Sequence, residues 1–252
     1  MEPQEYQIMA AIEDRHWWFA GRREIAGSLL ARFLPAMPQA ECRILEIGCG
    51  TGGNLAMLAK FGQVYGMDPQ EDARGYAQAK GIARAIRAGT LPETTGFEGE
   101  QFDAVVMMDV LEHITDDSAA LRKVRGALTQ DGVLFLMVPA YQFLWSPHDV
   151  ALHHHRRYNR RKLQRVVAAS GYKVTYLSYF NFLLFLPAVL VRLYKKVKGG
   201  EKAVSDTAGV PASWLNAILC RIFSSERYAL GNIALPFGIS LVLIATPCAE
   251  VV

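Results

Sequence analysis

The sequence has few cysteines, and none of them belongs to a recognisable motif. The four cysteines, Cys42, Cys49, Cys220 and Cys248, stand far apart and include no C-x-x-C pair. In a chain of this size such spacing indicates free thiols in a reducing compartment rather than a disulfide framework. The amino-terminal residues also lack the basic and then apolar pattern of a secretory signal peptide. We therefore expect a cytoplasmic protein.

The sequence has only a small excess of charge of one sign. Its formal net charge is +3, whereas nucleic-acid-binding domains usually carry a basic face and a higher pI. We therefore expect no nucleic-acid partner. The chain has 252 residues, of which 51% are hydrophobic, so it can bury a full core as one large domain or as one domain with an insertion.

No apolar run is long enough for a confident membrane span, which needs about 20 residues. The longest candidate, Tyr176–Val191, is interrupted by Asn181 and Pro187. Basic residues follow it at Arg192, Lys195, Lys196 and Lys198. Two interpretations stay open: an interfacial helix that lies on a membrane surface, or a buried strand that continues into a core helix.

Short apolar segments alternate with helical ones along most of the chain. The expected strands are 42–47, 64–67, 83–88, 102–108, 132–138, 172–179 and 239–246. The expected helices are 5–33, 54–60, 71–80, 116–128, 160–170 and 212–230. Uniformly apolar strands separated by helices predict an α/β fold: a doubly wound, mostly parallel, seven-stranded Rossmann-like sheet. The expected parts are a helical cap (1–40), a ligand-binding core (41–180), a helical insertion (181–234) and a last strand (235–252).

A glycine-rich turn follows the first strand in the segment "ILEIGCGTGGN", residues 44–54. Gly48, Gly50 and Gly53 satisfy G-x-G-x-x-G, so a dinucleotide-binding fold must be considered. Such a turn brings a ligand against bare backbone at a helix start. Glu46 would be an odd neighbour for a pyrophosphate, but it suits a ligand with a cationic amine and a sulfonium. Asp68, after the second strand, can accept both hydroxyls of a ribose in either ligand.

Together with "FDAVVMMDVLEHI" at residues 102–114, these features resemble the class I S-adenosylmethionine-dependent methyltransferases. The resemblance covers about residues 42–180 and the last strand. It implies that the glycines wrap the methionine part, that Asp68 holds the ribose, and that Asp109 and Val110 line the methionine side. Many relatives carry an acid at the adenine position, whereas this chain has Thr90 and the Leu91 backbone there. The cofactor residues implied are Glu46, Gly48, Cys49, Gly50, Gly52, Asn54, Asp68, Pro69, Thr90, Leu91, Asp109 and Val110.

Two neighbouring residues of the same motif, Glu112 and His113, have a structural and a catalytic interpretation. We expect them to cap and brace the helix that follows, with a role in catalysis as the alternative.

The segment "WSPHDVALHHHRRY", residues 145–158, concentrates four histidines behind the fifth strand. Adjacent histidines point in different directions in any regular structure, and no cysteine lies nearby, so we expect no metal. A neutral imidazole can instead take the proton that a methyl acceptor loses. The candidates are His148 with Asp149, or His154; the alternative for each histidine is a solvated loop position.

The same segment resembles a bacterial methyltransferase subgroup that also carries "WWF…RR" near its start and "LN…ER…LPFG-S" near its end. The resemblance implies functional positions at His148, Asp149, His154, Arg157 and Tyr158. Trp17, Trp18 and Arg22 are candidates for covering the cofactor or the acceptor, and simple helix packing is the alternative. The basic run at 156–161 is either a clamp for an anionic group on the acceptor or a solvated helix face.

These features predict a methyltransferase that uses S-adenosylmethionine and a small-molecule or lipid-linked acceptor, reached at a membrane surface if the acceptor is amphipathic. Two alternatives stay open: an NAD(P)-dependent oxidoreductase on a Rossmann domain, and a non-catalytic binding module.

Overall fold

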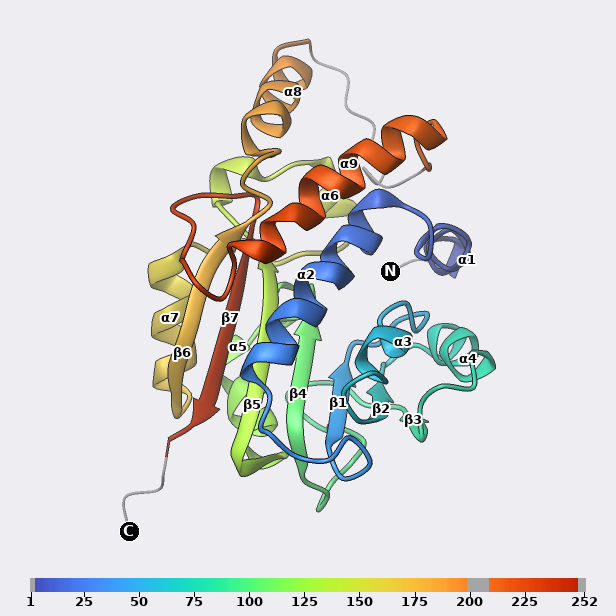
Figure 1. Ribbon diagram of the computed structural model, residues 1–252, viewed down its shortest axis with the longest axis vertical. Coiled ribbons are helices and arrows are strands. Elements are labelled where there is room, and N and C mark those ends of the chain that lie inside the picture. Colours follow the sequence, from blue (N-terminus) through green and yellow to red (C-terminus); the bar gives the residue numbers. More distant parts are fainter. Residues whose placement is uncertain (1–2, 199–208, 249–252) are drawn as a thin grey trace.

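The computed structural model describes residues 3–198 and 209–248, and among these it leaves the side chains of residues 3–5, 148 and 192–198 undescribed. A seven-stranded sheet with strand order β3-β2-β1-β4-β5-β7-β6 runs through its centre (Figure 1). The strands are β1 (Arg43–Ile47), β2 (Gln63–Met67), β3 (Ala85–Arg87), β4 (Phe102–Met108), β5 (Leu128–Pro139), β6 (Tyr172–Phe180) and β7 (Ser240–Pro247). Only the pairings of β7 with β5 and β6 are antiparallel within this sheet. The predicted mostly parallel seven-stranded sheet is confirmed.

Helices cover both faces of this sheet. The described helices are α1 (Pro3–Ile12), α2 (Trp17–Phe33), α3 (Leu55–Leu58), α4 (Glu71–Ala79), α5 (Asp117–Gly126), α6 (Pro147–Ala151), α7 (Arg160–Ala169), α8 (Phe185–Lys198) and α9 (Ser213–Ser225), with short 3-10 turns η1 (Leu111–His113), η2 (Gln142–Leu144) and η3 (Glu226–Tyr228). One core packs α5 and α7 on the sheet, and the other packs α2, α3 and α9 on the opposite face. Strands that are buried on both faces need apolar residues throughout, which is why they could be recognised in the sequence.

The amino-terminal segment forms two helices, not the single helix expected over 5–33. The chain breaks before α2, where the Nδ1 atom of His16 accepts a hydrogen bond from the Trp18 N–H over 3.2 Å and caps the helix. The break turns α1 away from α2, and in Figure 1 α1 lies opposite α4.

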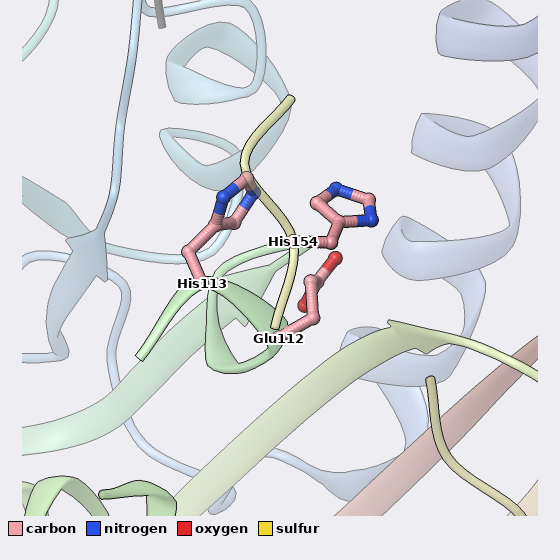
Figure 2. Close-up of side chains that lie close together, drawn as sticks. All are labelled: Glu112, His113 and His154. Carbon is pink, nitrogen blue, oxygen red and sulfur yellow. The ribbon is translucent and has the colours of Figure 1, made fainter. Parts of the chain in front are cut away.

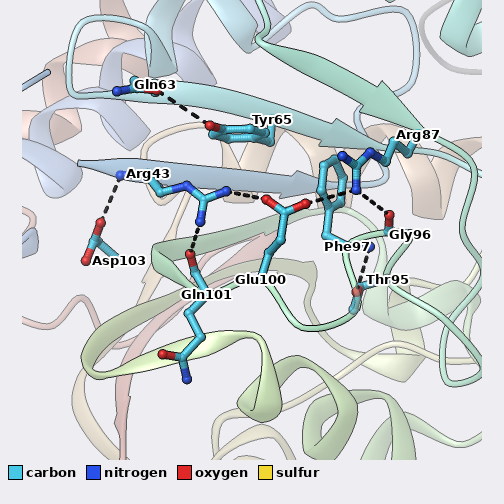
Figure 3. Close-up of polar contacts among 10 residues, drawn as sticks. All are labelled: Arg43, Gln63, Tyr65, Arg87, Thr95, Gly96, Phe97, Glu100, Gln101 and Asp103. Atoms are coloured by element: carbon cyan, nitrogen blue, oxygen red, sulfur yellow. Dashed lines mark hydrogen bonds and ion pairs between the residues drawn. The ribbon is translucent and has the colours of Figure 1, made fainter. Parts of the chain in front are cut away.

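The start of β1 is held by a polar network that extends along the sheet to the end of β3 (Figure 3). The Arg43 N–H donates to Asp103 over 2.9 Å, and the Arg43 side chain donates to the Gln101 carbonyl and to Glu100. Arg87 at the end of β3 donates to the same Glu100 over 2.9 Å. The network links β1, β3 and the start of β4, so it helps to fix the strand that carries the glycine turn.

The insertion between β6 and β7 returns to the amino-terminal helix. Helix α9 packs along α2 (Figure 1), and Gly21 lets the two approach, because a Cβ there would lie 2.6 Å from the Phe223 ring. Asn216 accepts from the Trp17 N–H and donates to the Arg15 carbonyl, each over 2.9 Å. Glu226 accepts from the backbone of Asn181 and Leu183 at the end of β6. The Asn and Glu of the "LN…ER" motif thus hold the insertion in place.

Helix α8 projects from the rest of the molecule at the top of Figure 1. Its side chains Leu186 and Leu190 are 64% and 66% exposed. The segment 176–191 therefore begins within the buried strand β6, as one interpretation predicted. The same interpretation expected a core helix after the strand, and this part of it is wrong because α8 is exposed. Among the described helices, none has the length and apolar character needed to cross a membrane.

We expect that replacing Asn216 by Ala lowers the free energy of unfolding by about 1–3 kcal/mol, because two hydrogen bonds that join distant segments are lost. Chemical denaturation measures this change. The matched control is Ser225→Ala on the same helix, whose hydroxyl bonds only the nearby Ile222 carbonyl and which should change the value by less than about 0.5 kcal/mol. Equal effects of the two substitutions would contradict the assigned role of Asn216.

Candidate functional site

A cavity of about 850 Å³ lies at the carboxyl edge of the parallel strands, the edge where open α/β sheets bind ligands. It extends from the glycine turn to the start of α8. Of the residues that the sequence assigned to the cofactor, its wall includes Gly48, Cys49, Gly50, Asn54, Asp68, Pro69, Asp109 and Val110. Of those assigned to the acceptor or to catalysis, it includes Trp17, Trp18, Arg22, His154 and Arg157.

The glycine turn brings backbone rather than side chains to the cavity. Gly48 has φ +69°, and a Cβ at this position would lie 2.5 Å from a methyl group of Val110. Asp68 accepts hydrogen bonds from the Gly50 and Gln70 N–H groups, each over 2.9 Å. Burial raises the pKa of Asp68, although these two hydrogen bonds oppose the rise. The glycine turn therefore leaves space for a ligand beside the Asp68 carboxylate, which the Gly50 and Gln70 N–H groups hold in one orientation.

Glu46 at the end of β1 is buried and lies behind this wall. Its Oε1 accepts from the Asn54 side chain over 2.7 Å, and its Oε2 has no hydrogen-bond partner among the described residues. Burial raises the pKa of Glu46 to about 8, while the Asn54 hydrogen bond and the charge of Arg22 act against the rise. A cationic group in the cavity would stabilise the ionised form.

Two residues from the amino-terminal segment close the cofactor end, and no local pattern in the sequence indicated either of them. Glu13 accepts from the Thr51 hydroxyl over 2.6 Å and from Lys80 over 2.7 Å, so it joins the glycine turn to the end of α4. Tyr6 lines the same end, and its pKa is raised to about 12 by burial and by the charges of Asp68 and Asp72. Their positions depend on the break between α1 and α2.

Arg22 and Asp109 meet in an ion pair in the middle of the cavity wall. Arg22 comes from α2 and is buried, and burial lowers its pKa to about 10. The sequence assigned Arg22 to the acceptor and Asp109 to the cofactor, and the structure joins them. Beside them Trp18 stacks on Phe223 with ring centroids 5.1 Å apart, while both Trp17 and Trp18 line the cavity. The tryptophans therefore pack α2 on α9 and also face the cavity.

Asp149 forms the centre of a buried polar group behind the acceptor side. It is fully buried and accepts from Arg157 through both carboxylate oxygens, over 2.7 and 2.9 Å, while its Oδ1 lies 2.9 Å from Nδ1 of His154. Burial alone would raise the pKa of Asp149, but the hydrogen bonds from His154 and Arg157 outweigh it and hold this pKa well below its usual range. Asp149 is therefore ionised, and His154 donates from Nδ1.

This arrangement corrects two assignments made from the sequence. Arg157 was expected to clamp an anionic acceptor, but its guanidinium is engaged by Asp149. Tyr158 was expected to bind the acceptor, but it is fully buried and its hydroxyl donates to Asp117 over 2.9 Å. Arg156 of the same basic run pairs with Asp117 over 2.9 Å. Asp149 lies only eight residues before Arg157, on α6, whereas Asp117 lies 41 residues before Tyr158, on α5.

Glu112 and His113 lie on η1 beside His154 and line the cavity (Figure 2). Glu112 is fully buried, and neither of its carboxylate oxygens has a hydrogen-bond partner in the described part of the chain. Burial raises the pKa of Glu112 to about 8, against the opposing charges of Arg22 and Arg157. Burial and then the charge of His154 lower the pKa of His113 to about 3.

The expected capping role of Glu112 and His113 is wrong. Asp116 caps α5 instead, by accepting from the Ala119 N–H over 2.8 Å. The two residues face the cavity, and the alternative interpretation, a role in catalysis, stays a prediction.

The assigned roles of the residues that line the cavity stay predictions, and Gly52 is not among the described residues that line it. Thr90 and Leu91 were expected at the adenine, but neither is among the described residues that line the cavity, and Leu91 is part of the hydrophobic core. His148 lies on α6, and its side chain is outside the described residues.

A family model and curated relatives both indicate a methyltransferase. A family model described as a methyltransferase domain matches residues 18–177. A ubiquinone biosynthesis O-methyltransferase of Methylocella silvestris is 34% identical over 160 residues, which cover 55% of this chain and 60% of that protein. The matched segments cover between 41% and 63% of the curated relatives compared with the chain.

Solved structures share the fold at low sequence identity. A chain from the complex of the Haloferax volcanii Trm112 methyltransferase activator with a methyltransferase has a TM-score of 0.60 and 18% identity, and the match covers 98% of this chain and 97% of that one. A sarcosine dimethylglycine methyltransferase structure from Galdieria sulphuraria has a TM-score of 0.58 and 14% identity, with 90% and 85% covered.

We expect Asp149→Asn to lower the free energy of unfolding by about 3–5 kcal/mol, because it leaves the buried Arg157 guanidinium without a counter-charge. Since the folded pKa of Asp149 lies below the unfolded one, this contribution is present above the unfolded pKa and is lost as the pH falls through the folded pKa.

Urea denaturation at neutral and acidic pH measures the effect of this substitution. The control is Asp131→Asn at an exposed position, with a change below about 0.5 kcal/mol. A variant at position 149 that is as stable as the parent at neutral pH would contradict the anchoring role.

Proposed function

The chain belongs to the methyltransferase-domain family and is an S-adenosylmethionine-dependent methyltransferase. We propose that it methylates a hydroxyl group of an amphipathic, isoprenoid-bearing acceptor at a membrane surface. The observation that carries this proposal is the composition of the cavity, which is polar at the glycine turn and apolar where it reaches α8 and α9. The alternatives of a nicotinamide-dependent oxidoreductase and of a non-catalytic module are set aside, because the family match identifies a methyltransferase.

The residues at the polar end fit the cofactor. The Gly48 backbone leaves a space that a Cβ could not share, Asp68 presents an oriented carboxylate to a ribose, and the orphaned oxygen of Glu46 suits the cationic methionine part. When bound, S-adenosylmethionine supplies a methyl group on a sulfonium, which an acceptor oxygen attacks in line. Positioning and exclusion of water are then the main tasks of the protein.

The opposite end suits an acceptor with an apolar tail. Leu184, Pro187, Ala188 and Val191 line the cavity where α8 begins, and Leu219 lines it from α9. The exposed face continues this surface outward through Leu186 and Leu190 on α8 and through Trp214, Leu215 and Ile218 on α9. In the sequence, four basic residues follow within α8, a pattern that favours contact with anionic lipids.

The head group of the acceptor would lie between these ends, beside Glu112, His113 and His154. Because Asp149 receives the Nδ1 proton of His154, Nε2 carries the lone pair of the neutral ring. That lone pair can bind the proton of an acceptor hydroxyl. A phenolic head with an isoprenoid tail meets both requirements, and the name of the Methylocella relative, a ubiquinone biosynthesis O-methyltransferase, supports an oxygen as the methyl acceptor.

We expect Asp68→Ala to weaken binding of S-adenosylhomocysteine at least tenfold, because a hydrogen bond to a charged group contributes about 1.5–3 kcal/mol. Isothermal titration calorimetry measures this, with Asp72→Asn on the exposed surface of α4 as a control that should stay within twofold of the parent. The parent protein should show no heat with NAD. Unchanged affinity in the Asp68 variant would refute the ribose assignment.

We expect the double substitution Leu186→Glu and Leu190→Glu to reduce binding to vesicles that contain phosphatidylglycerol at least fivefold. Each exposed leucine contributes about 2 kcal/mol when it leaves water, and the new carboxylates are repelled by the anionic surface.

Vesicle flotation measures the bound fraction, and methylation of an isoprenoid-tailed phenol presented in the same vesicles should fall with it. The control is Tyr76→Glu, which adds a charge at an exposed apolar position on α4. The proposal fails if the parent protein does not float with the vesicles, or if the control variant loses as much binding.

A further inference from the structure

Asn181 and Ser240 line the cavity from two neighbouring strands, at the end of β6 and at the start of β7. They are only 1% and 3% exposed, and neither is assigned to the cofactor or to catalysis. We infer that these two side chains form a neutral hydrogen-bonding subsite for a second oxygen of the methyl acceptor. This oxygen belongs to a hydroxyl or carbonyl group that is not itself methylated.

The side chains of both residues lack hydrogen-bond partners among the described residues. The Oδ1 atom of Asn181 is buried and unpaired, and no described residue is hydrogen-bonded to its Nδ2 atom. The Ser240 hydroxyl likewise makes no hydrogen bond within the described part of the chain. Buried polar groups are nearly always hydrogen-bonded, because an unpaired one is costly. An acceptor oxygen that bonds to both side chains would remove this cost.

The backbone of Asn181 is fixed, so its amide is preorganised for a ligand. Asn181 has φ +58°, a left-handed conformation that asparagine adopts more readily than most residues. Its N–H donates to Glu226 over 2.7 Å, and its carbonyl accepts from the Ile239 N–H over 3.4 Å. The insertion and the start of β7 therefore hold this residue from two sides.

The motif "LPFG-S" at residues 235–240 brings the serine to this place. A Cβ at Gly238 would overlap the Phe180 carbonyl oxygen, so only glycine lets the segment approach the end of β6 so closely. Ser240, the last residue of the motif, then pairs with Phe180 in the sheet, directly before Asn181. The subsite thus gives this motif a role in binding the acceptor.

The subsite lies farther along the edge of the sheet than the cofactor residues. Strand β5 pairs with β4 on one side and with β7 on the other, and β7 pairs with β6 (Figure 1). Since neighbouring strands are about 4.8 Å apart, Ser240 lies about 10 Å along this edge from β4. One aromatic ring and a hydrogen bond span such an interval. The apolar lining begins at Leu184, three residues after Asn181, so the second oxygen lies next to the tail.

The chemistry of the subsite favours a neutral group. An amide and a hydroxyl offer hydrogen-bond donors and acceptors without a net charge. In the described part of the chain, the one ionisable side chain hydrogen-bonded to Asn181 is Glu226, which would repel an anion. A hydroxyl or carbonyl oxygen therefore fits, whereas a carboxylate or phosphate does not.

The inference deepens the proposed function and rests on it, because the second oxygen belongs to the same acceptor as the reacting hydroxyl. The subsite makes and breaks no covalent bond. It orients the ring so that the reacting hydroxyl faces the methyl group, and it distinguishes acceptors with two oxygens from acceptors with one.

The test measures the affinity of the purified full chain for two probes by calorimetry, with S-adenosylhomocysteine present and in oxygen-free buffer. The probes are 2-geranylhydroquinone and 3-geranylphenol, which lacks the hydroxyl next to the tail. We expect the parent to bind the hydroquinone at least fivefold more tightly, because its second hydroxyl bonds to the subsite. Asn181→Gly and Ser240→Ala should each reduce this preference to less than twofold and leave the affinity for 3-geranylphenol within twofold.

The substitutions are chosen to remove the polar groups alone. Glycine at position 181 keeps the positive φ and both backbone hydrogen bonds. The matched control is Asn232→Gly in the same insertion, an exposed position outside the described cavity wall, and it should keep the preference. Binding of S-adenosylhomocysteine reports on folding and should stay within twofold in every variant.

The outcomes separate the subsite from the proposed function. Equal affinity of the parent for the two probes, or an unchanged preference in both variants, overturns the subsite, and methylation of 3-geranylphenol would still uphold the proposed function. A preference that depends on Asn181 and Ser240 supports the subsite even when neither probe is methylated, in which case the proposed reaction is wrong. If neither probe binds, both are refuted.

Discussion

The structure depends on keeping ionisable groups in a largely apolar wall at one edge of the sheet. Asp109 is matched by the guanidinium of Arg22 from a distant part of the chain, and Asp149 by that of Arg157 from the same loop region. Burying a charge is tolerable only when a partner arrives with good geometry. These two ion pairs therefore fix where α2 and the loop after α6 must lie, and the shape of the cavity follows from them.

The separate motifs of the sequence meet around this wall. The amino-terminal Trp17 is tied to α9 by Asn216, and the end of β6 is tied to η3 by Glu226. Helix α2 then places Arg22 against Asp109. Residues that are about 200 positions apart therefore form one support for the cavity, which explains why the motifs occur together in one chain.

The sequence predicted the sheet well and the site only in part, for physical reasons. A strand that is buried on both faces must be apolar throughout, so Phe102–Met108 could be predicted with its bounds. The glycine turn and Asp68 form a local pattern with a known ligand geometry. Arg157 and Tyr158 were misassigned because their roles depend on Asp149 and Asp117, and only the fold decides which partner a polar side chain meets.

Helix α2 reaches the middle of the cavity wall through Arg22, and at its start Trp17 holds α9, whose apolar face is open to solvent. A single rigid rod thus joins a nucleoside site to an outer surface. Thermodynamic linkage makes any coupling along this rod equal in both directions. If attachment to a surface changes the affinity for the nucleoside by some factor, then binding of the nucleoside changes the affinity for the surface by the same factor. Demethylated and methylated forms of the nucleoside could then differ in how long the protein resides at an interface.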